Sequence, residues 1–219
     1  MKMNKIAMAV GAAVMGLSAA AQAELSANIG VTSNYIWRGV TQTNDGAAVS
    51  GGIDYANDSG FYAGTWASNV SWVNGEELDL YAGFGGESGS LGYDLGVIYY
   101  MYPSDTTDSD FMEIYGSLTF SAFTAGLAYT IDKETSAGSD NDLYYYLSAG
   151  TELSDGWGVG ATIGHYNFDG GSTSDYTHVQ LDVTKSAGDF GDFTFSLSKA
   201  GKKSGDDTVI PFVSWAKSF

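Results

Sequence analysis

Residues 25–38 read LSANIGVTSNYIWR, and apolar and polar side chains alternate through this stretch. Leu25 and Ile29 fall on one side of the alternation, and Ser26 and Asn28 fall on the other. A period of two places neighbouring side chains on opposite faces of a β-strand. The stretch therefore predicts a strand with one apolar and one polar face.

The same alternation returns along the chain, between short segments that are rich in turn-forming residues. The 30 glycines and 15 tyrosines, against 2 prolines, favour strands and tight turns over helices. The pattern predicts twelve strands, at residues 25–39, 47–56, 61–70, 77–85, 91–102, 111–120, 123–131, 142–153, 157–168, 176–185, 192–200 and 208–219. For the strand at 61–70 the alternation allows either phase, so its outward face stays open.

The N-terminal residues resemble an export signal. Lys2 and Lys5 precede an apolar run at 6–17, and small residues follow up to Ala21-Gln22-Ala23. A charged start, an apolar stretch and an A-x-A ending are typical of a secretory signal peptide, whereas a first transmembrane helix would need a longer run. We therefore expect two parts: a signal peptide at 1–23 and a single β domain at 24–219.

The composition excludes several classes of function. The chain has 26 acidic and 9 basic residues, a formal net charge of −17, and no cysteine. A strongly acidic protein is a poor partner for nucleic acid, and without cysteine there are neither disulfides nor thiolate metal sites. Acidic loops can hold Ca²⁺, but their spacing here fits no EF-hand, so we expect no metal and no cofactor.

The predicted connections alternate between short turns and mostly longer, more charged loops. If the chain starts on the periplasmic side, every short turn lies there and every longer loop lies outside, which is the arrangement of an outer-membrane barrel. Twelve strands of Leu, Val, Ile and Phe would overfill a soluble barrel, which is the alternative reading of the same alternation. The expected fold is therefore all-β: a single antiparallel up-and-down transmembrane β-barrel.

Aromatic residues and the C-terminus support this reading. Tyr35, Trp37 and Trp157 fall near the ends of the apolar faces, as in the aromatic girdles of membrane barrels. Trp215 and the terminal Phe219 lie on an alternating last strand and resemble the assembly signal of outer-membrane barrels. We expect outer-membrane lipid, lipopolysaccharide and the barrel-assembly machinery as partners.

Two segments carry a family resemblance. Residues 33–39, SNYIWRG, and 60–69, GFYAGTWASN, are similar to the N-terminal signature of the TorF family of porins, earlier catalogued as a bacterial family of unknown function. Residues 77–83 and 93–97 fit the same pattern. The resemblance implies a Gram-negative outer-membrane β-barrel and brings no catalytic residues with it.

The polar face of the strands contains the candidate functional residues. Arg38 is the only arginine and is predicted on the inner face near the outer end of the first strand, either as a selectivity group or as half of a structural ion pair. Inward carboxylates would favour cations, and inward tyrosines would either narrow the pore or form a partial interior core. The acids are Asp54, Asp79, Asp94, Glu113, Glu152 and Asp182, and the tyrosines are Tyr81, Tyr100, Tyr115, Tyr144 and Tyr146.

The function predicted from these features is passive diffusion of small polar or cationic solutes through a narrow lumen. The alternative is a closed structural or surface-interaction barrel without transport. An enzyme is not expected, because His165 and His178 are the only histidines and neither falls in a pattern that suits nucleophilic catalysis.

Overall fold

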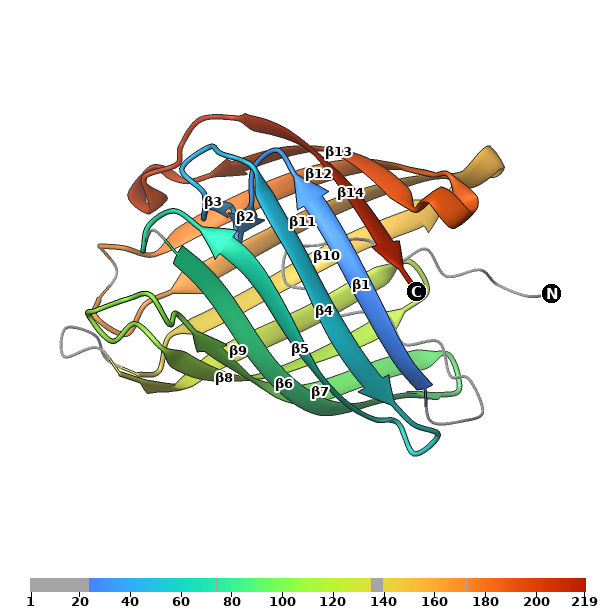
Figure 1. Ribbon diagram of the computed structural model, residues 1–219, viewed down its shortest axis with the longest axis horizontal. Coiled ribbons are helices and arrows are strands. Elements are labelled where there is room, and N and C mark those ends of the chain that lie inside the picture. The colour runs from blue at the N-terminus through green and yellow to red at the C-terminus, as the bar shows by residue number, and fades with distance from the viewer. Residues whose placement is uncertain (1–23, 74, 135–139, 172) are drawn as a thin grey trace.

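The computed structural model describes residues 24–73, 75–134, 140–171 and 173–219, so the predicted signal peptide at 1–23 lies outside the described residues. Twelve strands form a single closed antiparallel barrel, in which β14 pairs with β1 to complete the ring (Figure 1). The barrel strands are β1 (Glu24–Thr32), β4 (Ala48–Ala56), β5 (Phe61–Val70), β6 (Gly75–Ser88), β7 (Leu91–Met101), β8 (Phe111–Phe120), β9 (Phe123–Lys133), β10 (Leu143–Glu152), β11 (Trp157–Asn167), β12 (Tyr176–Ser186), β13 (Asp192–Ala200) and β14 (Ile210–Ser218).

The predicted fold class and strand number are confirmed. In the sequence between β1 and β4, the short strands β2 (Ile36–Trp37) and β3 (Val40–Thr41) form a separate two-stranded hairpin. This hairpin is not part of the barrel sheet. The described residues also form three short 3₁₀ turns: η1 (Ser154–Gly156), η2 (Gly188–Phe190) and η3 (Lys202–Ser204). Among the described residues, no helix is long and apolar enough to span a membrane.

The outer surface of the barrel is apolar. Leu25, Leu95 and Leu181 are 73%, 66% and 57% exposed, and the predicted apolar positions of the other strands also point outward. A soluble barrel would turn this face inward, so the apolar face excludes the soluble alternative. Tyr93 and Trp157 lie on the same outer surface, where a girdle is expected.

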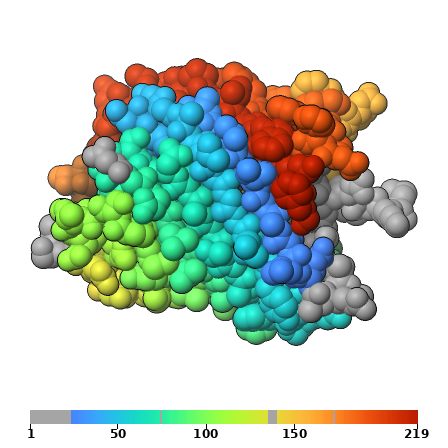
Figure 2. Space-filling model, in the orientation of Figure 1, coloured from blue at the N-terminus to red at the C-terminus, as the bar shows by residue number. Residues whose placement is uncertain are grey.

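The first and last strands close the ring. Val31 pairs with Trp215, and the main chain of Phe219 exchanges hydrogen bonds with Ala27, at 2.8 Å from the Phe219 N–H and 3.3 Å to the Phe219 carbonyl. In Figures 1 and 2 the red β14 lies beside the blue β1 and leaves no open strand edge in that view. Closure matters because every unpaired main-chain polar group in lipid is costly.

The open phase of the strand at 61–70 is settled by its packing. Tyr62 is 8% exposed and lies inside the barrel, with Trp66 on the same face. A side chain on Gly83 of the neighbouring β6 would overlap the Tyr62 ring, and one on Gly96 of β7 would overlap Tyr115. Glycine therefore makes room for rings that lie flat against the inner wall.

The two ends of the barrel differ, as the sequence predicts. Short turns such as 57–60, 89–90 and 121–122 gather at one end, and most of the connections at the other end are longer. We name these the short-turn end and the long-loop end. The inserted hairpin comes from the long-loop end.

Candidate functional site

The segment at 33–47 leaves the barrel wall and turns into the lumen. The predicted strand at 25–39 is wrong beyond Thr32, because β1 ends there and the chain bends inward. Within the insertion, Ile36 pairs with Thr41 and Trp37 with Val40, so Arg38 and Gly39 form a two-residue turn at the tip. Their φ angles of 48° and 86° are both positive, as a type I′ hairpin turn requires.

A compact network holds the base of this hairpin. The Thr41 hydroxyl donates to Asn34 Oδ1 at 2.6 Å, and the Asn34 amide donates to Asp45 Oδ1 at 2.8 Å. The Tyr35 main-chain N–H donates to the Thr43 hydroxyl at 3.1 Å. Because Asn34 and Thr43 are buried, these bonds fix the hairpin as a shaped insert.

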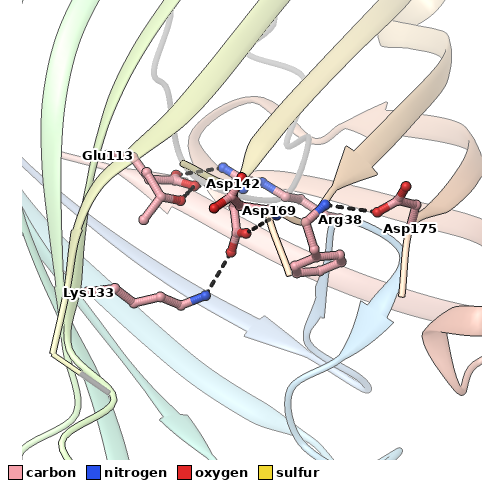
Figure 3. Close-up of polar contacts among 8 residues, drawn as sticks. Arg38, Glu113, Lys133, Asp142, Asp169 and Asp175 are labelled. Carbon is pink, nitrogen blue, oxygen red and sulfur yellow. Dashed lines mark hydrogen bonds and ion pairs between the residues drawn. The ribbon is translucent and has the colours of Figure 1, made fainter. Parts of the chain in front are cut away.

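Arg38 ties the hairpin tip to the far wall. Its Nη1 and Nη2 donate to Oε1 and Oε2 of Glu113 on β8 at 2.8 and 2.7 Å, and Figure 3 shows the two groups pointing at one another. The guanidinium carbon also lies 4.2 Å from the Trp37 ring centre and 4.3 Å from that of Tyr144. A bidentate ion pair with a carboxylate, combined with stacking on aromatic rings, is the geometry in which arginine binds most specifically.

Gly39 brings the tip against another strand. A side chain at this position would overlap His178 on β12, whose Nε2 lies 2.9 Å from the Tyr144 hydroxyl. His178 is 4% exposed, so the contact is made deep in the lumen. Together with the Arg38 tie, this contact makes the hairpin reach from β1 and β4 to β8 and to β12.

Tyr35 and Trp37, predicted on the outer girdle, lie inside the barrel. Trp37 meets the rings of Tyr100, Phe111 and Tyr166 edge-on, with centres 6.0, 6.2 and 5.9 Å away. The girdle prediction is wrong for both residues because it assumed that β1 continues past Thr32. Aromatic packing on three wall strands instead seats the hairpin in the bore.

Carboxylates gather around the hairpin. Glu77 and Asp79 on β6 are 2% and 6% exposed, and Glu113 is 1% exposed. Glu77 accepts hydrogen bonds from the hydroxyls of Tyr35 and Tyr102 at 2.7 and 2.9 Å. Burial and the nearby Glu77 charge raise the pKa of both tyrosines, so both remain donors at neutral pH.

Asp79 differs from its neighbours. Its Oδ1 is buried and has no hydrogen-bond partner among the described residues. Arg38 is engaged with Glu113 and is therefore not the partner of Asp79.

A second polar layer lies further from the hairpin. The Tyr62 hydroxyl donates to Asp94 Oδ1 at 2.7 Å and lies 2.6 Å from the Tyr115 hydroxyl. Asp54 accepts from the Asn28 amide at 3.1 Å and from the Tyr81 hydroxyl. Tyr81 therefore acts first as a partner of the wall carboxylate Asp54, and Tyr115 reaches Asp94 only through the Tyr62 hydroxyl.

The wall of β12 and β13 is lined by hydroxyls and amides. Asp182 accepts from the Ser196 hydroxyl at 2.6 Å and from the Gln180 amide at 3.0 Å. The hydroxyls of Thr184 and Thr194 lie 2.9 Å apart on the same face. This side of the lumen is polar with little charge.

The remaining predicted site residues occupy different places. Tyr100 and Tyr144 pack against the hairpin, and Tyr146 stacks on Tyr144 with ring centres 5.8 Å apart. Glu152 is exposed on β10 at the short-turn end, away from the other carboxylates. Trp215 donates through Nε1 to the Phe190 carbonyl at 2.7 Å, near the C-terminal Phe219.

Sequence reasoning missed Glu77, Tyr102 and Gly39 as members of this site. The local signal was present: Ser33-Asn34 is a turn-forming pair, and Ile36 breaks the alternation by placing an apolar residue on the polar phase. Among the described residues, no group of three or more His, Asp or Glu is placed to hold a metal ion.

A cavity of about 420 Å³ opens above the hairpin at the long-loop end. Trp37 borders it from the hairpin, Trp72 and Tyr102 from the loops, and Phe111 and Tyr166 from the strands. Lys133 lies at its edge and pairs with Asp142 at 2.7 Å (Figure 3). The cavity and the hairpin below it are thus one continuous feature of the barrel mouth.

Comparison with known proteins places these features in context. A family described as "Bacterial protein of unknown function (Gcw_chp)" matches residues 17–205, which confirms the family resemblance seen in the sequence. No curated protein matches the chain.

Solved structures match the fold. A "KdgM porin" aligns with a TM-score of 0.59 at 10% identity, over 89% of this chain and 98% of that one. A NanC porin aligns with a TM-score of 0.57 at 8% identity, over 88% and 98%. A "KdgM porin in complex with disordered oligogalacturonate" aligns with a TM-score of 0.57 at 10% identity, over 89% and 97%. At such identities the likeness shows a shared barrel fold.

Proposed function

Because this chain belongs to the Gcw_chp family of bacterial proteins of unknown function, we propose its role from its own lumen: an outer-membrane porin for small polar solutes, constricted by an inward hairpin. The observation that carries the proposal is the hairpin at 33–47, which is seated inside a closed barrel whose outer surface is apolar and whose inner wall is polar. The shared fold with KdgM and NanC porins supports it.

The barrel sits in the outer membrane with its short-turn end toward the periplasm. The predicted export signal at 1–23 and the apolar outer surface support this location and orientation. Lipid and lipopolysaccharide then cover the outside of the strands. The barrel-assembly machinery reads the last strand at Trp215 and Phe219.

The hairpin sets the size limit of the passage. Arg38 reaches Glu113 on the far wall and Gly39 abuts His178, so the tip divides the lumen at this level. A solute passes beside the tip, between side chains that are held by hydrogen bonds. Small molecules are therefore the class that this lumen admits.

The charge of the lumen sets which sign of charge it prefers in a solute. Asp54, Asp79, Asp94 and Asp182 face inward, whereas the inward Arg38 is already paired with Glu113. Carboxylates in a narrow passage attract cations and repel anions. The oligogalacturonate held by a KdgM porin is a polyanion, and the lumen proposed here suits cationic or uncharged solutes instead.

The same hairpin favours a second candidate function. If the tie between Arg38 and Glu113 keeps the bore shut, the protein is a closed structural barrel. The two candidates differ in one measurable property, which is a continuous water path.

Reconstitution of the refolded chain separates these candidates. Swelling of liposomes in uncharged solutes of graded size measures permeation, and the reversal potential in a salt gradient measures the sign of selectivity. A porin gives swelling that falls as the solute grows, together with a potential of cation-selective sign. Inserted protein that permits no swelling and no ion current supports the closed barrel, and anion selectivity contradicts the acidic-lumen argument.

A further inference from the structure

The cavity at the long-loop end has walls made largely of aromatic rings. Of the rings that line it, Phe111 stacks on Tyr100 with ring centres 4.3 Å apart, and Tyr166 stacks on Phe168 at 4.2 Å. Trp37 lies between these two stacks, with its edge toward Phe111 and Tyr166. A flat molecule or a ring with an apolar face finds aromatic surface on opposing walls here.

Loop residues extend the aromatic wall toward solvent. Trp72, in the connection after β5, meets the Tyr102 ring at 4.6 Å. Trp72 is 48% exposed, so part of its indole stays open at the mouth. The indole of Trp72 therefore adds partly exposed aromatic surface to the entrance of the cavity.

Polar side chains lie between the rings. Gln42 from the hairpin, Ser109 from the loop before β8 and Ser174 from the loop before β12 all line the cavity. Amide and hydroxyl groups both donate and accept hydrogen bonds. They suit a ligand that carries many hydroxyls around its edge.

The cations at the cavity, Lys133 and Lys203, and Arg38 under its floor all have partners. Lys133 pairs with Asp142 at 2.7 Å, and Arg38 under the floor pairs with Glu113. An anionic ligand would have to compete with Asp142 or Glu113 for these cations. Charge balance therefore favours an uncharged ligand over an acidic one.

We propose that this cavity is a capture site for an uncharged saccharide of one or two rings. A sugar ring presents an apolar C–H face to aromatic rings and hydroxyls to Gln42 and the serines, so it matches both kinds of wall. The volume of about 420 Å³ lies near the lower end of ligand pockets, which fits a small saccharide and not a long chain. The inference rests on the proposed function, because it names a solute class for that passage.

The lumen wall formed by β12 and β13 carries amide, imidazole and hydroxyl groups. His178 and Gln180 on β12 and the hydroxyls of Ser196 and Ser198 on β13 face the lumen. A hydroxylated solute leaving the aromatic site can exchange hydrogen bonds along this wall. This wall therefore carries polar groups of the same kind as Gln42 and the serines of the cavity.

The test is a binding titration of the full chain refolded in detergent micelles. The probes are maltose, cellobiose and lactose, with digalacturonate as the charged comparison and benzyl alcohol as the planar aromatic one. Tryptophan fluorescence reports binding, because Trp37 and Trp72 border the cavity. Calorimetry on the same samples gives a second measure.

The variants are chosen to separate the cavity from the rest of the barrel. Trp72→Ala and Phe168→Ala each remove one ring from the cavity, and each is expected to weaken disaccharide binding about tenfold. Trp157→Ala is the matched control, because Trp157 is 45% exposed, close to the 48% of Trp72, but lies at the short-turn end. It is expected to bind as the unchanged protein does. Far-UV circular dichroism verifies that each variant is folded.

Saturable binding of at least one uncharged disaccharide, weakened by the two cavity variants and unchanged by Trp157→Ala, supports the site. The proposal is overturned if folded protein binds none of the three disaccharides, if Trp157→Ala weakens binding as much as Trp72→Ala, or if digalacturonate or benzyl alcohol binds more tightly than every disaccharide. Binding is measured independently of ion current. A barrel that binds sugar but lets no sugar through therefore refutes the porin proposal and leaves the capture site standing.

Discussion

Arg38 and Glu113 join the tip of the inserted hairpin to the opposite wall of the barrel through two hydrogen bonds of 2.8 and 2.7 Å. Both side chains are more than nine-tenths buried. Such a pair is costly to break on one side only, because the remaining charge is left buried without a partner. The position of the hairpin therefore depends on this contact.

Loss of Arg38 should destabilise the barrel more than loss of the whole pair. Arg38→Met leaves Glu113 uncompensated, and we expect a cost of about 3–5 kcal/mol in the free energy of unfolding. The double variant Arg38→Met/Glu113→Leu removes both charges and should recover part of that cost. Urea unfolding from lipid vesicles measures the free energy of unfolding of the single and the double variant. A double variant that is less stable than Arg38→Met would contradict the pairing argument.

Gly39 is expected to be less tolerant of a side chain than a glycine of the same conformation elsewhere. Gly205 has φ +87°, close to the +86° of Gly39, but has no atom near an added Cβ, whereas Gly39 faces His178. Gly205→Ala should cost about 1–2 kcal/mol from backbone strain alone. Gly39→Ala should cost more, because the hairpin tip must also move away from His178. Equal losses of thermal stability would show that the close approach is unimportant.

Tyr62 connects two wall groups below the hairpin. Tyr62→Phe removes the hydrogen bond to Asp94 and the contact with the Tyr115 hydroxyl, so we expect a loss of about 1–3 kcal/mol in unfolding free energy. Tyr93→Phe is the control, since Tyr93 is 47% exposed on the outer surface. The same urea titration compares the two, and a greater loss for Tyr93→Phe would refute the assigned role.

Asp79 is expected to contribute to cation preference. Asp79→Asn removes a carboxyl group at the level of the hairpin, so the reversal potential in a salt gradient, measured at a pH at which that carboxyl is ionised, should move toward zero. Asp58→Asn makes the same chemical change in the exposed 57–60 turn and should leave the potential nearer to that of the unchanged chain. The role of Asp79 fails if the two variants have the same effect.

The barrel was predictable from the sequence because alternation is a local signal. Leu95 and Leu181 lie on the outer surface since their strands continue a period of two, and the phase of each strand follows directly. The phase at 61–70 was not predictable, because Tyr62 is large and apolar enough for either face. Packing against Gly83 decides it, and that glycine is on another strand.

The hairpin was not predictable for a different reason. The local signs of a break, at Ser33-Asn34 and Ile36, are weak, because Tyr35 and Trp37 still continue the phase of Ile29 and Val31. What turns the chain inward is the gain from distant partners. Trp37 packs on Tyr100 and Tyr166, and Arg38 binds Glu113, none of which is near in sequence.

The central claim is that the hairpin held by Arg38 and Glu113 sets the width of a solute path. Single-channel conductance in planar bilayers tests it most directly, with Glu113→Gln compared with the unchanged chain. Asp189→Asn, in the exposed 3₁₀ turn η2, is the matched control. We expect a larger conductance for Glu113→Gln, because the hairpin tip loses its charged tie to the far wall, and an unchanged conductance for Asp189→Asn. Equal conductance for the unchanged chain and a folded, inserted Glu113→Gln variant would contradict the claim.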